Sequence, residues 1–414
     1  MAKLQPVRGT HDLLPDDARR HRHIVETGLA IASRYGFGEI ETPIFEFTEV
    51  FKRTLGEASD VVSKEMYTFT DRGGDEITLR PEGTAGVARA LISGGLSQSL
   101  PLKLYYQGPM FRYERPQKGR QRQFHQIGIE LLGVPEPQAD IEVIACGADI
   151  LAALGILDRT VLELNTLGDA ESRGAYRAAL VSYFQDHAEA LSEDSRHRLT
   201  VNPLRILDSK NEGDRAIVAN APSFDDHLNP LSQDFFAAVT EGLSALGIAC
   251  QRNMRLVRGL DYYCHTAFEF VTDALGAQGT VMGGGRYDGL VETMGGPAIP
   301  GVGWAAGIER LAMMVDGVPG PARPIALVPV GVGVERALMA LAHRLRKAGH
   351  TVEHGYSGNV GKRLKRAGRL GARVALILGE DELARGVIQR RDLDAGAQEE
   401  VPLDGIEGHL ARFR

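Results

Sequence analysis

The pattern of hydrophobic and polar positions predicts a long helix over residues 16–35, which Pro15 and Asp16 begin and Gly36 ends. Short extended runs follow and predict strands at residues 39–47, broken by Pro43, and at residues 77–79, 104–107, 126–132 and 268–271. Because several of these strands come in succession without helices between them, they favour an antiparallel or mixed sheet. Residues 140–154 predict a long helix packed on that sheet.

The second half of the chain changes character twice. Residues 170–225 are polar and helical in pattern, which indicates an insertion between two parts of one domain. Residues 316–324 are rich in Pro and Gly and are typical of a linker. After them the pattern alternates between strands at 325–330, 351–354 and 373–378 and helices at 334–348 and 359–369. This alternation predicts a small C-terminal α/β domain over residues 324–414.

Composition narrows the class of protein. A chain of 414 residues that is 43% hydrophobic and 24% charged is typical of a soluble globular protein of two or three domains. Its three cysteines are widely spaced, which argues against a disulfide framework or a structural zinc site, and no metal site is predicted. We see no signal peptide and no run approaching the roughly 20 apolar residues of a membrane span. A cytoplasmic protein without membrane contact is expected.

The distribution of charge modifies the meaning of the net charge of −7, which by itself speaks against a nucleic-acid partner. Residues 362–373 contain six basic residues and no acidic one, and residues 112–122 contain five basic residues and one acidic residue, Glu114. Local fields act within about 8–10 Å, so such patches matter more than the total. A solvated helix face and a charged loop explain the same patches.

Two runs in the first half carry candidate chemistry. Residues 79–84 leave a strand and enter a helix, where Glu82 beside Thr84 can hold an ammonium group or cap the helix. Residues 106–126 place a basic loop with Gly and Pro between two extended runs. Arg112, inside the first of these runs, suits a phosphate that it grips with two parallel bonds. Phe124 can stack on a base or belong to the core, and the loop can reach a nucleic-acid end.

Three later runs are each open to two interpretations. Residues 257–263 put Arg258 and a pair of tyrosines before a strand. The tyrosine hydroxyls can donate hydrogen bonds in a pocket, or the tyrosines can be ordinary strand residues that are half core and half surface. Residues 283–289 begin with three glycines, which permit close approach to a ligand or form a tight turn. Residues 301–311 are small residues along a strand that turns into a helix, where Arg310 can meet a terminal phosphate. A packed strand–helix junction explains this last run equally well. His125 and His265 are interpreted as core or hydrogen-bonding residues.

Taken in order, these runs resemble the class II aminoacyl-tRNA synthetases, and within them the histidyl-tRNA synthetase family. Residues 38–56 resemble motif 1, which builds the dimer interface in that family, residues 104–130 resemble motif 2, and residues 301–311 resemble motif 3. The runs VRGLDYY and GGGRYDGL resemble two signatures particular to the histidine enzymes. The resemblance implies an α+β catalytic domain with an antiparallel sheet over residues 1–318, interrupted by 170–225. It also implies a C-terminal α/β anticodon-binding domain and a homodimer.

The resemblance further implies a histidine–tRNA ligase that uses ATP, Mg²⁺, L-histidine and tRNA-His. Arg112 then holds the α-phosphate and the histidine carboxylate, Arg310 holds the γ-phosphate, and Arg258 stabilises charge at the α-phosphate; these are the implied catalytic residues. The implied histidine site comprises Glu82, Gly83, Thr84, Arg112, Gln126, Glu130, Arg258, Tyr262, Tyr263 and Tyr287. The implied ATP site comprises Arg112, Arg120, Phe124 and Arg310. The implied tRNA contacts are Arg115, Gln117, Lys362, Arg363, Lys365 and Arg366.

Three rival functions are weaker. A paralogue of these synthetases serves as a regulatory subunit of ATP phosphoribosyltransferase, but it loses parts of the substrate signatures and lacks the C-terminal domain, both of which are present here. A synthetase-like sensor that regulates a kinase carries a kinase domain, for which 414 residues leave no room. A generic ATP-dependent ligase explains Arg112 and Arg310, but not the RGLDYY run or the basic C-terminal helix.

Overall fold

Eight strands form the main sheet of the computed structural model, which describes residues 3–56, 59, 61–207, 209, 211–256 and 262–413. The strand order is β1-β5-β6-β11-β10-β9-β7-β8. The pairs β1–β5 and β7–β8 are parallel, and the other pairs are antiparallel. The strands are β1 Gly38–Glu39, β5 Leu102–Phe111, β6 Gln123–Leu132, β7 Val161–Thr166, β8 Cys250–Arg252, β9 Cys264–Val271, β10 Thr280–Arg286 and β11 Gly301–Gly307. The predicted α+β fold with a largely antiparallel sheet is confirmed.

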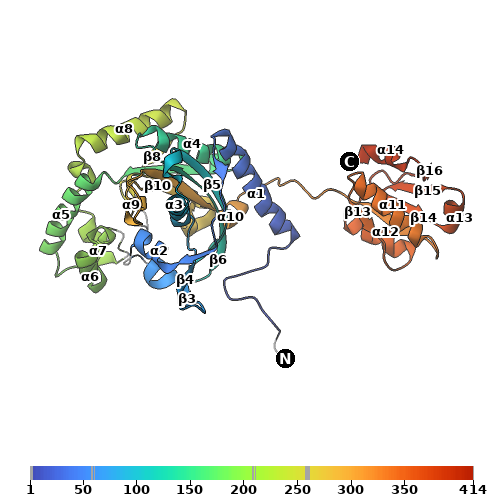
Figure 1. Ribbon diagram of the computed structural model, residues 1–414, viewed down its shortest axis with the longest axis horizontal. Helices are drawn as coiled ribbons and strands as arrows, with labels where there is room; N and C mark the ends of the chain where they lie inside the picture. The colour runs from blue at the N-terminus through green and yellow to red at the C-terminus, as the bar shows by residue number, and fades with distance from the viewer. Residues whose placement is uncertain are drawn as a thin grey trace. The chain divides into compact units, whose positions relative to one another are not determined.

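Helices cover both faces of this sheet (Figure 1). Successive residues of a strand point to opposite faces, and β5 shows the consequence. Tyr105 belongs to the core beneath α1 (Pro15–Arg34) and α4 (Gln138–Ala153), which α10 (Ile308–Ala312) completes. Tyr106 belongs to a second core with α3 (Thr84–Ser93) and α9 (Leu290–Thr293). The sheet therefore carries one apolar core on each side, and the candidate site lies on the side of α3.

A small three-stranded sheet accompanies the large one. Its order is β2 (Phe45–Phe47), β4 (Glu76–Leu79) and β3 (Tyr67–Thr70), and it packs with α2 (Thr48–Leu55) and a π-helix at Val61–Glu65. The single extended run expected at residues 39–47 is thus two strands in two different sheets, because the chain turns away from the large sheet after β1 at the Pro43 break.

Residues 170–225 fold as helices between β7 and β8. The helices are α5 (Ala170–Asp186), α6 (Glu193–Val201) and α7 (Glu212–Val218), and α8 (Pro230–Ala245) follows them. Asp169, Ser192 and Asn211 accept backbone N–H bonds at the starts of α5, α6 and α7, which satisfies donors that lack intrahelical partners. The segment buries a core of its own around Leu180 and Phe184. Short 3-10 helices lie at Leu96–Ser99, Leu157–Arg159, Pro203–Ile206, Phe224–His227, Asp273–Gln278 and Ala411–Phe413.

The chain divides into two compact units at Val318 and Pro319. The second unit has a five-stranded sheet of order β13-β12-β14-β15-β16, in which β12 pairs in parallel with β13 and β14. Its elements are β12 Ile325–Pro329, α11 Glu335–Lys347, β13 Val352–His354, α12 Val360–Arg369, β14 Val374–Leu378, α13 Glu380–Ala384, β15 Val387–Asp392, β16 Gln398–Pro402 and α14 Ile406–Leu410. The sequence prediction ended at β14 and missed the β15–β16 hairpin. Within the described chain, no helix combines the length and the apolar character needed to cross a membrane.

Candidate active site

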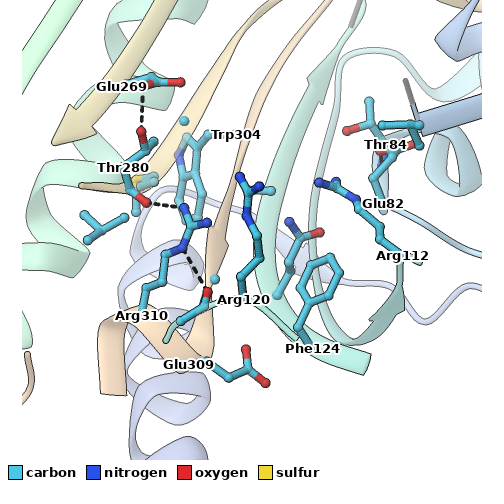
Figure 2. Close-up of a pocket in the computed structure, with 18 of the residues that line it drawn as sticks. Glu82, Thr84, Arg112, Arg120, Phe124, Glu269, Thr280, Trp304, Glu309 and Arg310 are labelled. Atoms are coloured by element: carbon cyan, nitrogen blue, oxygen red, sulfur yellow. Dashed lines mark hydrogen bonds between the residues drawn. The ribbon is translucent and has the colours of Figure 1, made fainter. Parts of the chain in front are cut away.

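A cavity of about 360 Å³ opens in the first unit, over the middle strands of the large sheet (Figure 2). Its walls come from the loop between β5 and β6, from β9, β10 and β11, and from the starts of α3 and α10. The predicted site residues that line it are Glu82, Thr84, Arg112, Arg120, Phe124, Gln126, Tyr262, Tyr263 and Arg310. Segments that are far apart in the sequence therefore meet in one cavity.

The other predicted site residues lie elsewhere. Glu130 and Tyr287 are buried behind the cavity wall, and Gly83 lies directly before α3, against the ring of Tyr106. Arg115 and Gln117 belong to the loop that follows Arg112 and are outside the cavity lining. Arg258 lies outside the described residues. The basic residues of α12 belong to the second unit.

Arg112 projects from the end of β5, one residue past the strand rather than inside it. Its Nε donates to the carbonyl of Pro81 at 2.9 Å, and its guanidinium carbon lies 5.3 Å from the centre of the Phe124 ring. Glu114 lies 4.0 Å from the guanidinium of Arg112 and forms an ion pair of 2.9 Å with Arg120. Because the Glu114 side chain is only 11% exposed, its carboxylate holds Arg120 in the cavity wall and attracts Arg112 more weakly.

Arg310 lies on the opposite side of the cavity from Glu82 and Thr84 (Figure 2). Its Nε donates to the carbonyl of Gly119 at 3.2 Å, and Nη1 donates to the carbonyl of Thr280 at 2.6 Å. The hydroxyl of Thr280 in turn donates to Glu269 at 2.8 Å. Burial lowers the pKa of Arg310 from its usual value, but a guanidinium remains charged in proteins. The backbone thus fixes a cation where an anionic group can reach it.

Two buried carboxylates occupy the other end of the site. Glu82 accepts the backbone N–H groups of Thr84 at 2.5 Å and Ala85 at 2.9 Å, at the positive end of α3. The capping interpretation of this run is therefore realised in the structure. Glu130 accepts the hydroxyls of Thr84, at 2.7 Å, and of Tyr287. Burial raises the pKa of Glu82 and raises that of Glu130 to about 8, so the folded protein retains a proton on Glu130 through most of the range below that pH.

The three glycines at 283–285 lie inside β10 and do not form a tight turn. A side chain at Gly284 would collide with the backbone of β11, and one at Gly303 would collide with the carboxylate of Glu130. The missing side chains at these positions keep the cavity floor flat and leave room for the buried carboxylate. The tight-turn interpretation of this run is therefore wrong, and close approach to a ligand stays a prediction.

Several lining residues were not predicted. Glu114, Glu269, Thr280, Trp304 and Glu309 all contribute to the cavity wall. Glu114 had a detectable signal, because it is the one acidic residue in the basic loop. Glu269 and Thr280 had none, since they meet only where β9 pairs with β10. The histidines agree with their predicted hydrogen-bonding and packing roles: His125 bonds Glu309 at 2.8 Å, and His265 stacks on Phe235 at 4.5 Å.

Comparisons with known proteins agree with this geometry. The histidyl-tRNA synthetase family model matches residues 9–311, and an anticodon binding domain model matches residues 325–412. The histidine–tRNA ligase of Rhodospirillum rubrum is 64% identical over 415 residues and covers 100% of both chains. That of Gluconacetobacter diazotrophicus is 59% identical over 411 residues and covers 99% of both chains.

Solved structures extend the comparison to the fold. Apo histidyl-tRNA synthetase from S. aureus matches with a TM-score of 0.84 and 35% identity, covering 98% of this chain and 99% of that one. A Bacillus halodurans protein, described as an ATP phosphoribosyltransferase regulatory subunit/histidyl-tRNA synthetase, is 21% identical with a TM-score of 0.66, covering 92% of this chain and 99% of that one. At that identity the likeness extends to the fold alone. The chain belongs to the histidyl-tRNA synthetase family.

Proposed function

We propose that this chain is a histidine–tRNA ligase. It activates L-histidine with ATP to histidyl-adenylate, releases pyrophosphate, and transfers histidine to the 3′ end of tRNA-His. The observation that carries the proposal is the distribution of charge around the cavity. The guanidinium groups of Arg112, Arg120 and Arg310 line it, and a polar cluster around Glu82 and Glu130 lies at one end. Full-length identity of 64% to a histidine–tRNA ligase supports the same conclusion.

The first step needs charge stabilisation more than a base. The histidine carboxylate is already ionised when it attacks the α-phosphorus, so catalysis consists largely of positioning and of stabilising negative charge. Arg112 holds the α-phosphate and the substrate carboxylate, and Arg310 holds the γ-phosphate. Both roles fit guanidinium groups that backbone carbonyls of Pro81, Gly119 and Thr280 hold in place. Arg258 stabilises charge at the α-phosphate, and Arg120 and Phe124 complete the ATP site.

Mg²⁺ enters this scheme with the nucleotide. Hard oxygen ligands suit it, and most of these come from the phosphates themselves. Glu269 is the lining carboxylate that fits a supporting role, because it faces the cavity beside Thr280 and the Arg310 guanidinium. The ion neutralises negative charge on the phosphates when it is bound.

Specificity for histidine arises at the carboxylate end. Glu82 and Thr84 take the α-amino group, Gln126 lies beside the carboxylate, and Tyr263 contacts the imidazole nitrogens, with Tyr262 around the pocket. Glu130 and Tyr287 lie behind the wall, and Glu130 acts on the pocket through the Thr84 hydroxyl that it accepts. A site built to hydrogen-bond a polar side chain leaves buried groups unpaired when an apolar amino acid enters. Such a penalty gives discrimination on the order of 10⁴ without an editing site.

Transfer RNA engages two regions. Arg115 and Gln117 in the loop after Arg112 contact the acceptor end, and α12 contacts phosphates near the anticodon. Lys362 and Lys365 on α12 are exposed, whereas Arg363 donates to the carbonyl of Pro329 and Arg366 lies 3.6 Å from Glu353. The two lysines therefore make the larger electrostatic contribution to tRNA binding.

The protein acts as a homodimer in the cytoplasm. Support for the dimer comes from β2, whose alternation is inverted: Phe45 and Phe47 are each 58% exposed, while Glu46 between them is buried. The Glu46 carboxylate accepts Nε of Arg89 at 3.1 Å and its Nη2 at 2.5 Å, which compensates for the burial of its charge. Apolar side chains on the outer face of a strand are typical of a surface that a partner covers.

Charging of purified tRNA-His with labelled histidine tests the proposal. We expect ATP-dependent formation of histidyl-tRNA, and no charging of a tRNA for another amino acid. The regulatory paralogue is the alternative. Failure of well-folded protein to charge tRNA-His, together with stimulation of an ATP phosphoribosyltransferase catalytic subunit, would establish that alternative.

A further inference from the structure

His21, His125 and Glu309 meet beside the cavity from three separate elements, α1, β6 and α10. Their candidate ligand atoms all lie within 4.8 Å of one another. Nδ1 of His125 is 2.8 Å from Oε1 of Glu309, and the rings of His21 and His125 meet edge to face with centroids 5.5 Å apart. All three side chains are half-buried. The sequence predicted no metal site because these residues are far apart in the chain.

Ordinary hydrogen bonding explains only part of this cluster. The Glu309 carboxylate also accepts the backbone N–H of His125 at 3.0 Å, so these two residues fix the start of β6 against α10. That role does not involve His21, whose ring comes from α1 and meets the His125 ring edge to face. A second imidazole beside an already paired histidine and glutamate calls for a different explanation.

Two imidazoles and one carboxylate form a ligand set that suits Zn²⁺ with one position left open. Oxygen-preferring ions such as Mg²⁺ or Ca²⁺ fit this donor set poorly. When each ligand atom lies about 2.0 Å from a tetrahedral Zn²⁺, the ligand atoms are roughly 3.3 Å from one another. Small side-chain rotations would therefore bring the three observed ligand atoms, now within 4.8 Å of one another, to these separations.

We propose that His21, His125 and Glu309 form a binding site for a transition-metal ion of the Zn²⁺ type. The ion ties the N-terminal helix to the two elements that carry ATP-site residues, because His125 lies between Phe124 and Gln126 and Glu309 precedes Arg310. The site is distinct from the proposed place of Mg²⁺ beside Glu269, since its donors are mainly nitrogen.

Metal titration of the full chain tests this site without relying on activity. Chelator-treated protein is titrated with Zn²⁺ by calorimetry and with Co²⁺ by its visible d–d absorption, in the wild type, in H21A and in H23A. His23 lies on the same helix, two residues further along, and serves as the matched control. We expect one equivalent of metal in the wild type and in H23A. Loss of a ligand weakens binding by at least about tenfold in H21A.

A second readout shows whether H21A is folded. Thermal unfolding of the metal-free proteins, followed by far-UV circular dichroism, is expected to give the same transition for H21A, H23A and the wild type. Three results overturn the site: no stoichiometric binding by the wild type, equal affinity in all three proteins, or a cobalt–thiolate band that assigns the ion to a cysteine.

Discussion

The hydroxyl of Thr84 donates a hydrogen bond of 2.7 Å to Oε1 of Glu130, which joins the start of α3 to β6 across the floor of the site. Tyr287 donates to the other oxygen of the same carboxylate. Hydrogen bonds within the protein therefore hold this polar end of the cavity together. Its buried carboxylate has a shifted pKa, and this shift gives the site a measurable pH dependence.

Glu130 is expected to make folding stability fall as pH rises. Burial raises its pKa from 4.5 to about 8 in the folded protein, so between these values the folded state holds a proton that the unfolded state has released. The free energy of unfolding then falls by up to about 1.4 kcal/mol per pH unit in that window. Denaturant unfolding between about pH 5 and pH 8 should show a flatter profile for E130Q than for the wild type.

The exposed residue Glu26 on α1 provides the control for that experiment. E26Q should retain the wild-type slope. A slope in E130Q equal to that of the wild type would mean that Glu130 is ionised throughout this pH range.

Glu114 is expected to support ATP binding through the two arginines beside it. E114Q removes the negative charge that pairs with Arg120 at 2.9 Å and lies 4.0 Å from Arg112. A loss of about 1 kcal/mol corresponds to an increase of about fivefold in the KM for ATP, with little change in the KM for histidine. Steady-state pyrophosphate exchange measures both constants, and E193Q on the exposed side of α6 is the control. An unchanged KM for ATP would contradict the orienting role.

Arg258 is expected to act in adenylate formation and not in folding. R258A should lower the rate of histidine-dependent pyrophosphate exchange by about a hundredfold or more, since it removes one cation that stabilises developing charge. Thermal unfolding and the affinity for ATP should change little. Exchange at the wild-type rate would remove Arg258 from the mechanism.

The basic face of α12 is expected to bind tRNA through Lys362 and Lys365. K362Q/K365Q should raise the KM for tRNA and lower the slope of log affinity against log salt by about 1 to 2, because fewer counterions are released. Exchange without tRNA should stay unchanged. K347Q is the control, because Lys347 is an exposed lysine at the end of α11. Right-handed crossovers from β12 to β13 and from β13 to β14 put α11 and α12 on opposite faces of the sheet. Equal effects of both variants would contradict a specific role for α12.

The aromatic face of β2 is expected to lie in the dimer interface. F47D places a charge on a side chain that is 58% exposed in the single chain, so it should shift sedimentation from dimer toward monomer while the fold is kept. L231D changes a residue on α8 that is 66% exposed and should leave the association state unchanged. A fully dimeric F47D would exclude this face.

Local patterns predicted much of the fold. The strand–turn–helix at Thr84 and the small-residue strand before Arg310 were predicted from spacing alone, and both are present. The β15–β16 hairpin was missed because its strands are rich in charge, without an apolar alternation. Its pairing is visible only in three dimensions, where Arg390 lies opposite Glu399 and the two form an ion pair.

Site residues that belong to a single sequence motif were predicted. Site residues that come together only through tertiary contacts were missed. Arg112 and Arg310 belong to recognisable runs, and both line the cavity. Glu269 enters the site through strand pairing, which no local pattern encodes. Glu309 belongs to the run before Arg310, but its contact with His125 depends on packing between α10 and β6. The shift in the pKa of Glu130 likewise depends on burial, a property of the folded core.

Amino-acid-dependent exchange of pyrophosphate into ATP, with each of the twenty amino acids in turn and no tRNA, tests the central claim most directly. We predict exchange with histidine and none above background with the other nineteen. Exchange with a different amino acid, or none at all from well-folded protein, would contradict the assignment of this cavity as a histidine-activating site.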